Sequence, residues 1–154
     1  MAPAPAGFDR YPDLLALVRR AFAAHVGRID PPSSAMRATA DSLRAIAEAG
    51  TLLLATAADG TLAGCVFGTP QGSDLYLGKL AVDPAWQGRG IGARLVTALA
   101  DHARAAGFAR VTLGVRLALV ENIALFAGLG FVRTGVQCHP GFDTPTSQDM
   151  VLVL

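Results

Sequence analysis

Apolar positions recur along the chain with two different periods, and the points where the period changes mark the predicted elements. Residues 11–26 repeat apolar side chains at the spacing of one helical face, which predicts a first helix. Prolines at 31 and 32 then prevent a continuous helix. Ser33 or Ser34 offers an N-cap for a second helix that runs to about Ala49.

Short apolar runs predict strands around one further long helix. Residues 51–57 and 62–69 flank Ala58-Asp59-Gly60, and a D-G turn between such runs predicts a hairpin. Hairpins at both ends of the chain around one strand–helix–strand unit imply an α/β fold, with a mixed sheet and helices on both faces. Residues 1–154 are expected to form a single domain without repeats. The other expected elements are strands at 75–82, 110–115, 131–138 and 148–154, and helices at 88–106 and 120–127.

The composition argues against several classes of function. Of the 154 residues, 52% are hydrophobic and 16% are charged, which is enough apolar material for a core. Basic and acidic residues nearly balance, with a net charge of +1, and the basic residues form no cluster. We therefore expect no nucleic-acid partner and no membrane binding. No stretch resembles a secretory signal or a membrane span, so a cytoplasmic protein is predicted.

The cysteines and histidines form no metal-binding pattern. Cys65 and Cys138 lie far apart in segments that look apolar, and the histidines at 25, 102 and 139 are scattered. Neither set has the spacing of a structural zinc site. We expect no disulfide and no metal.

The most informative segment joins the strand at 75–82 to the long helix. It contains Gln87-Gly88-Arg89-Gly90-Ile91-Gly92-Ala93-Arg94. A strand that turns through glycines into a helix leaves bare amide N–H groups at the positive end of the helix dipole, and this arrangement binds phosphate. The glycines let an anion approach the backbone without a Cβ in the way, and the arginines add charged donors.

Two other phosphate-binding motifs are alternatives for this segment. Residues 88–93 also fit the dinucleotide fingerprint G-x-G-x-x-A, which would indicate an oxidoreductase. That fingerprint belongs to the first strand of a longer alternating unit, and Arg116 stands where a ribose-binding acid belongs, so we disfavour it. A P-loop ATPase is disfavoured because no Gly-Lys-Ser/Thr follows the glycines.

Two motifs resemble the GNAT superfamily of acetyl-CoA-dependent N-acetyltransferases. The first is the signature Q/R-x-x-G-x-G/A, with Gln87, Gly90 and Gly92 at its positions, preceded by a strand that ends in L-x-V-x-P. The second is the segment at 121–131, ENIALFAGLGF, which is similar to the family's E-N-I-A-L-Y-x-x-L-G-F. The order of elements fits from about Leu14 onward, although the family's usual first strand is short or absent here.

The resemblance implies a mostly antiparallel sheet whose central parallel strands splay apart to hold acetyl-CoA. Backbone groups of Leu80 and Val82 would then pair with the pantetheine arm, and the amide of Val82 would point at the thioester carbonyl. A preorganised N–H at that point is typically worth about 3 kcal/mol. Asn122 would bond the pantetheine arm and Phe126 would lie beneath the cofactor. The amides expected to hold the pyrophosphate belong to the loop that contains Gln87, Gly88, Arg89, Gly90, Gly92 and Ala93.

The family's acid and base are not where the resemblance places them. The position of the usual catalytic tyrosine is Phe126, which has no hydroxyl, and the position of a glutamate base is Tyr76. A thiolate is already a fair leaving group, so water could replace the acid. His139 is the favoured base because its ordinary pKa suits proton transfer. Glu121 and Asp74 remain candidates.

Other side chains carry weaker hypotheses. A covalent acyl-enzyme on Cys138, assisted by His139, is disfavoured because adjacent side chains of a strand point to opposite faces. His25 and His102 are explained by a helix end and a helix face, and Cys65 by the core. Arg37 could pair with a carboxylate of the acceptor.

The predicted activity is transfer of an acetyl group from acetyl-CoA to a primary amine of a small molecule or peptide. The residues do not separate an amino acid, a polyamine, an aminoglycoside or a protein N-terminus as acceptor. The alternative is a catalytically weak or inactive acyl-CoA-binding or regulatory domain with the same fold. Members of the family often dimerise, so the resemblance also admits a homodimer.

Overall fold

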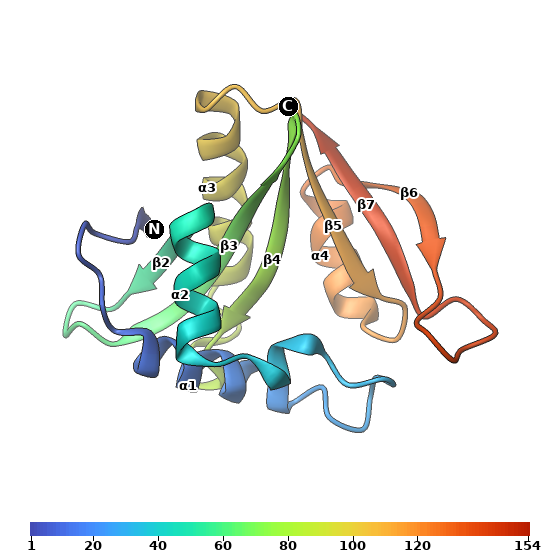
Figure 1. The fold of residues 1–154 in the computed structure, drawn as a ribbon, viewed down its shortest axis with the longest axis horizontal. Helices are drawn as coiled ribbons and strands as arrows, with labels where there is room; N and C mark the ends of the chain where they lie inside the picture. The colour runs from blue at the N-terminus through green and yellow to red at the C-terminus, as the bar shows by residue number, and fades with distance from the viewer.

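The protein is built on one seven-stranded sheet, seen in a computed structural model that describes residues 1–154 (Figure 1). The strand order is β1-β2-β3-β4-β5-β7-β6, and every neighbouring pair is antiparallel except β4 and β5. The predicted α/β class with one central parallel pair is therefore confirmed. The strands are β1 (Ala2–Pro3), β2 (Thr51–Thr56), β3 (Leu62–Gln71), β4 (Asp74–Val82), β5 (Arg110–Arg116), β6 (Val132–Gln137) and β7 (Ser147–Val153).

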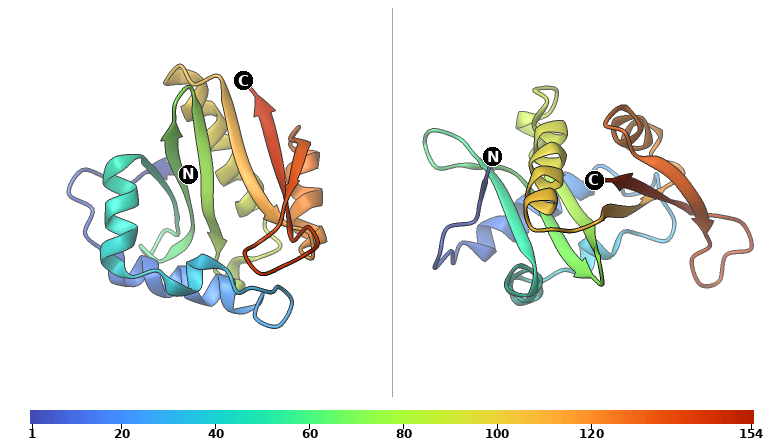
Figure 2. Two further views of the ribbon diagram at one scale, coloured as in Figure 1. Left: turned by 45° about the vertical axis from the view of Figure 1, so that its right-hand side comes forward. Right: turned by 90° about the horizontal axis from the view of Figure 1, so that it is seen from above.

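Helices cover the two faces of the sheet unequally (Figure 2). Helices α3 (Ile91–Ala105) and α4 (Val120–Gly128) lie on one face and share a core with β2 to β5 and β7. Helices α1 (Tyr11–Ala23) and α2 (Ala40–Ala49) lie on the other, and their core draws buried residues from β2, β3 and β4 but none from β5, β6 or β7. Half of the second face therefore has no helix over it.

The parallel strands β4 and β5 pair over only a short distance. Their register joins Asp74 to Arg110, Leu75 to Val111 and Tyr76 to Thr112, and beyond that point the strands diverge (Figure 1). A bulge in β4 lies just past the last pair: Cys65 of β3 pairs with Ala81 and Phe67 with Gly78, so Lys79 and Leu80 together oppose Val66. Lys79 has φ 48° there. Because a bulge bends its strand, it turns β4 away from β5.

The element boundaries differ from the predictions at three places. The first helix ends at Ala23 and not at Val26, since the amides of His25 and Val26 donate to carbonyls three residues back (3.0 and 3.2 Å). The long helix begins at Ile91 and not at Gly88, because Gly88 and Gly90 have left-handed φ values of 78° and 75°.

The predicted second helix is divided into two. A short 3₁₀ turn, η1 (Ser34–Arg37), is followed by extended backbone at Ala38, and α2 starts anew. A capping box explains the new start: the Ser42 amide donates to the Thr39 hydroxyl (3.0 Å) and the Thr39 amide to the Ser42 hydroxyl (2.9 Å). The first strand, expected to be short or absent, is the two-residue β1.

The packing of α2 against the sheet predicts an intolerant glycine. A Cβ at Gly50, which ends α2, would lie 2.2 Å from the backbone oxygen of Gly68 in β3. Gly50→Ala should therefore lower the free energy of unfolding by about 1–3 kcal/mol, as overpacking does. Urea unfolding measures this. Gly128→Ala is the matched control, since no atom lies within 4 Å of its Cβ position. Equal urea midpoints for the two variants would contradict the prediction.

Candidate acyl-transfer site

A cavity of about 990 Å³ opens where β4 and β5 diverge. Its wall is formed by these two strands, the loop between β4 and α3, the start of α4, the segment after α1 and the hairpin loop before β7. Of the site residues predicted from the sequence, Arg89 and the alternative base Asp74 do not line it. Those that do are Tyr76, Leu80, Val82, Gln87, Gly88, Gly90, Gly92, Ala93, Asn122, Phe126 and His139.

The cavity has two sides because successive strand residues point to opposite faces. Leu77, Leu113 and Val115 belong to the core under α3 and α4, so this half is called the helix side. Tyr76 and Gly114 alternate with them and therefore lie on the opposite face, which α1 and α2 leave partly uncovered. This half of the cavity is called the open side. The gap between the diverging strands connects the two sides.

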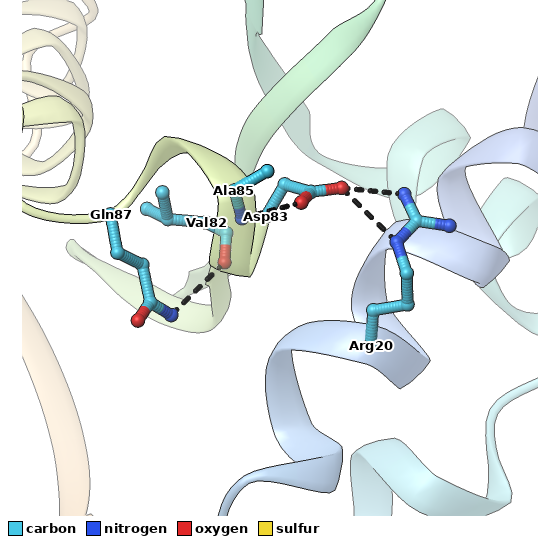
Figure 3. Close-up of polar contacts among 5 residues, drawn as sticks. All are labelled: Arg20, Val82, Asp83, Ala85 and Gln87. Atoms are coloured by element: carbon cyan, nitrogen blue, oxygen red, sulfur yellow. Dashed lines mark hydrogen bonds and ion pairs between the residues drawn. The ribbon is translucent and has the colours of Figure 1, made fainter.

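The loop that follows β4 is held in place by Asp83 (Figure 3). The Asp83 carboxylate accepts from the Ala85 amide (2.9 Å) and from two nitrogens of Arg20 on α1 (2.7 and 3.1 Å). The amide of Ala85, followed by the Arg20 guanidinium, lowers the pKa of this carboxyl below its usual value. The Gln87 amide group donates to the Val82 carbonyl (3.4 Å). These contacts fix where the chain leaves the sheet and enters α3.

The start of α3 presents backbone donors to the helix side of the cavity. The first amides of any α-helix have no intrahelical acceptor. The N-cap here is Gly90, which has no side chain to accept from them, so they stay available to a ligand. A Cβ at Gly92 would have only Leu125 and Val82 within 4 Å, each at 3.8 Å, and all three residues line the cavity. Arg89 instead stacks its guanidinium 4.7 Å from the ring centre of Trp86.

The amide of Val82 faces the gap. The Asp83 amide donates to Ala63 of β3 (2.8 Å), and Val82 is the neighbouring position, paired with Gly64. Because hydrogen-bonded and non-bonded pairs alternate along an antiparallel ladder, the Val82 N–H points away from β3. It therefore points to the side where β5 has moved off.

Phe126 is part of the core as well as of the cavity. Its side chain is 6% exposed and meets Phe131 edge to face, with ring centres 5.7 Å apart. It packs in the core beneath α3 and α4 and forms part of the floor on the helix side. Nothing about this position requires a hydroxyl for stability.

The candidate bases differ in their surroundings. His139 lines the open side, where its ring and its amide (3.0 Å) both contact the Thr146 hydroxyl. Burial and then the Arg116 charge lower the pKa of His139 below its ordinary value, so its imidazole is neutral at pH 7. Glu121 lines the cavity but is paired with Arg28 at 2.7 Å.

Asp74 lies away from the cavity. It is held by Arg110 through two contacts of 3.0 and 2.7 Å at the end of β4 where the strands are still paired. Cys138 is exposed, contrary to the apolar surroundings expected for it, and it does not line the cavity. Cys65 is buried, and burial raises the pKa of its thiol to about 12.

Comparison with known proteins identifies the fold family. Residues 14–131 match the family model described as acetyltransferase (GNAT) family. The chain belongs to the GNAT acetyltransferase family. A dinucleotide-binding fold is thereby ruled out for the glycine-rich loop, as is a P-loop.

The curated relatives match over one segment only. A stretch of 58 residues, 38% of this chain, is 45% identical to N-alpha-acetyltransferase RimI of Mycobacterium tuberculosis and covers 35% of that protein. A segment of the same length is 43% identical to an uncharacterised protein of Mycobacterium leprae and covers 15% of it. The match thus spans about a third of one relative and less of the other.

Solved structures share the whole GNAT fold. The ribosomal-protein-S18-alanine N-acetyltransferase of Escherichia coli superposes with a TM-score of 0.74 at 23% identity, covering 93% of this chain and 86% of that one. The ribosomal-protein-alanine N-acetyltransferase of Brucella melitensis gives 0.72 at 20% identity, covering 94% of both chains. No helix of the structure is long and apolar enough to span a membrane.

The GNAT cavity also contains residues that sequence reasoning left aside. His25 lines it because α1 ends early; burial, followed by Arg28, lowers the pKa of its ring. Its Nδ1 is buried without a hydrogen-bond partner, and the ring packs edge to face on Phe22 at 5.5 Å. Arg116 lines the open side and reaches the Pro32 carbonyl at 3.4 Å. No periodicity or motif in the sequence marks either His25 or Arg116 as a residue of the cavity.

The effect of the Arg116 charge on His139 predicts a measurable shift in pKa. Arg116→Gln should raise the pKa of His139, because loss of a nearby positive charge favours the protonated ring. The pKa should stay below the ordinary histidine value of about 6.5, since burial is the larger cause. NMR titration of the ring protons reads this directly. Arg133→Gln on β6 is the control, and the same His139 pKa in both variants would contradict the assignment.

Proposed function

We propose that this GNAT protein transfers an acetyl group from acetyl-CoA to a primary amine of a small-molecule or peptide acceptor. The observation that carries the proposal is the continuous cavity between β4 and β5. It joins backbone donors at the start of α3 to an open side lined by His139 and Tyr76. Two substrates can thus approach one point from opposite faces of the sheet. Residues 1–154 are proposed to act as one domain.

The helix side suits acetyl-CoA. The amides of Gln87 to Ala93 would hold the pyrophosphate, helped by the positive end of the α3 dipole. The pantetheine arm would pair with the backbone at Leu80 and Val82, where β4 has lost its parallel partner. Asn122, in the first turn of α4, would bond the arm from the other wall.

The chemistry would proceed by direct attack of the amine on the thioester carbonyl carbon. The Val82 N–H would stabilise the charge that gathers on the carbonyl oxygen. His139 or Tyr76, directly or through water, would accept the proton lost by the amine. The Phe126 ring can donate no proton to the leaving sulfur, so the thiolate would leave unprotonated or take its proton from water.

Peptide N-termini are the acceptors to test first. The similar enzymes of Escherichia coli and Brucella melitensis are described as acting on alanine of ribosomal proteins. The M. tuberculosis relative is described as an N-alpha-acetyltransferase. A short peptide with N-terminal alanine therefore heads a panel that also includes free amino acids, polyamines and aminoglycosides.

A second candidate is a GNAT domain that binds acyl-CoA and catalyses weakly or not at all. Phe126 and Tyr76 favour it, because they stand where the family resemblance places an acid and a base. The two candidates differ in one measurable respect: only the enzyme releases free thiol when an amine is added.

The first test combines affinity and turnover. Calorimetric titration with acetyl-CoA should show binding by the wild-type protein, and amine-dependent release of free thiol should follow with at least one member of the panel. Gly92→Leu should abolish binding because its side chain would fill the helix side between Leu125 and Val82, without backbone strain. Thr97→Leu places the same side chain at an exposed position of α3 and should bind normally.

The outcomes of this test separate the proposals. Unchanged affinity in Gly92→Leu would refute the placement of the cofactor. Binding by the wild-type protein without thiol release from any amine would favour the regulatory domain.

A hydroxyl at position 126 provides a second test. Phe126→Tyr restores a proton donor at the floor of the helix side, and general acid catalysis typically contributes about 10²-fold or more where protonation limits the rate. We expect kcat to rise with unchanged affinity for acetyl-CoA. Phe131→Tyr, its edge-to-face neighbour outside the cavity lining, is the control. An unchanged kcat would assign protonation of the leaving group to solvent.

A further inference from the structure

Asp149 occupies an unusual position on the open side of the sheet. It is the central residue of a cross-strand row on β5, β7 and β6, in which its two partners are Gly114 and Gly135. Both partners lack side chains, so neither of them covers the carboxylate. A hollow is therefore left on the part of this face that α1 and α2 do not cover.

The hollow brings Asp149 and Tyr76 toward the same point. A Cβ placed on Gly114 would lie 3.7 Å from the Tyr76 hydroxyl and 4.0 Å from Oδ1 of Asp149. Gly114 and Tyr76 both line the cavity, and Asp149 stands beside Gly114, just outside the lining. The phenol and the carboxylate thus border one empty space above Gly114, at the point where β4 and β5 begin to separate.

The two oxygens of Asp149 have different roles in the fold. Oδ2 accepts from the side-chain amide of Gln137 on β6 (2.9 Å), which orients the carboxylate. Oδ1 points toward the hollow above Gly114. A carboxylate held through one oxygen and open through the other is arranged to accept a proton or an N–H group.

Asp149 also differs from the other acidic groups around the site. Glu121 is paired with Arg28, Asp74 with Arg110 and Asp83 with Arg20. None of the five ion pairs of the protein includes Asp149. Its negative charge is therefore available to a cationic or N–H-bearing substrate.

We propose that Asp149, in place of His139 or Tyr76, is the catalytic base of the acetyl transfer and that Tyr76 holds the acceptor amine beside it. This inference rests on the proposed function. The amine would enter the hollow above Gly114 and donate an N–H to Asp149, directly or through one water. An ammonium is attracted to the carboxylate and first passes one proton through it to solvent, so that the amine reacts in its neutral form. The nitrogen becomes acidic again once it bonds to the carbonyl carbon.

The nitrogen lone pair forms the bond to the thioester carbonyl carbon, and the carbonyl electron pair moves to oxygen and returns as the C–S bond breaks. The sulfur leaves with its electron pair as a thiolate. The nitrogen proton passes to Oδ1 of Asp149 and from there to solvent, which regenerates the carboxylate.

The test compares Asp149→Asn with the wild-type protein, using acetyl-CoA and the most active amine of the panel. Asparagine keeps the shape and the contact with Gln137 but accepts no proton, so kcat should fall by about 10²-fold or more. Affinity for acetyl-CoA and the melting temperature should not change. Asp143→Asn, in the exposed loop before β7, is the matched control and should keep full activity. Asp149→Glu should recover part of the lost rate.

A second variant tests the hollow without touching the carboxylate. Gly114→Val should raise KM for the amine and leave the acetyl-CoA affinity unchanged, because its side chain fills the space between Tyr76 and Asp149. A kcat for Asp149→Asn equal to that of the control would overturn the inference while leaving the proposed transferase intact. No thiol release by the wild-type protein with any amine would overturn both.

Discussion

The short pairing of β4 with β5 is the constraint on which the site depends. Only three residue pairs join the strands, and the bulge at Lys79 and Leu80 then turns β4 away. Backbone donors and acceptors that would normally bond across a parallel pair are left without partners at the centre of the sheet. Such groups are costly to leave unsatisfied, so a ligand with amide groups along its length is a natural complement.

The unequal cover of the sheet gives the two sides of the cavity different chemistry. On the helix side, the loop residues that line the wall are Gln87, glycines and Ala93, which carry no charge. An anionic group of a ligand there would be bound by backbone amides and stabilised by the helix dipole. Elsewhere the wall carries charged side chains, among them Lys79 on β4, Arg116 on β5 and Glu121 on α4. Recognition of an acceptor by charged side chains is therefore expected away from the glycine-rich loop.

Features that depend on neighbours in sequence could be predicted, whereas features that depend on strand pairing could not. The hairpin of β2 and β3 follows from Asp59-Gly60 between two apolar runs. The break before α2 was missed because Ser33 offers a cap as good as that of Thr39, and only packing decides between them. Asp149 has no local signal, since its significance comes from the glycines that face it on two other strands.

The missing acid and the exposed carboxylate fit one chemical logic. At neutral pH, thiolate expulsion needs little help, whereas the nitrogen must lose a proton for the amide to persist. A site with a base and no acid therefore still assists the more demanding of the two proton transfers, the removal of the proton from nitrogen. A thioester bound above the buried ring of Phe126 would be shielded from water on that side, which would limit its hydrolysis. The loss of a hydroxyl on the helix side is thus compatible with catalysis as long as a carboxylate or imidazole serves the open side.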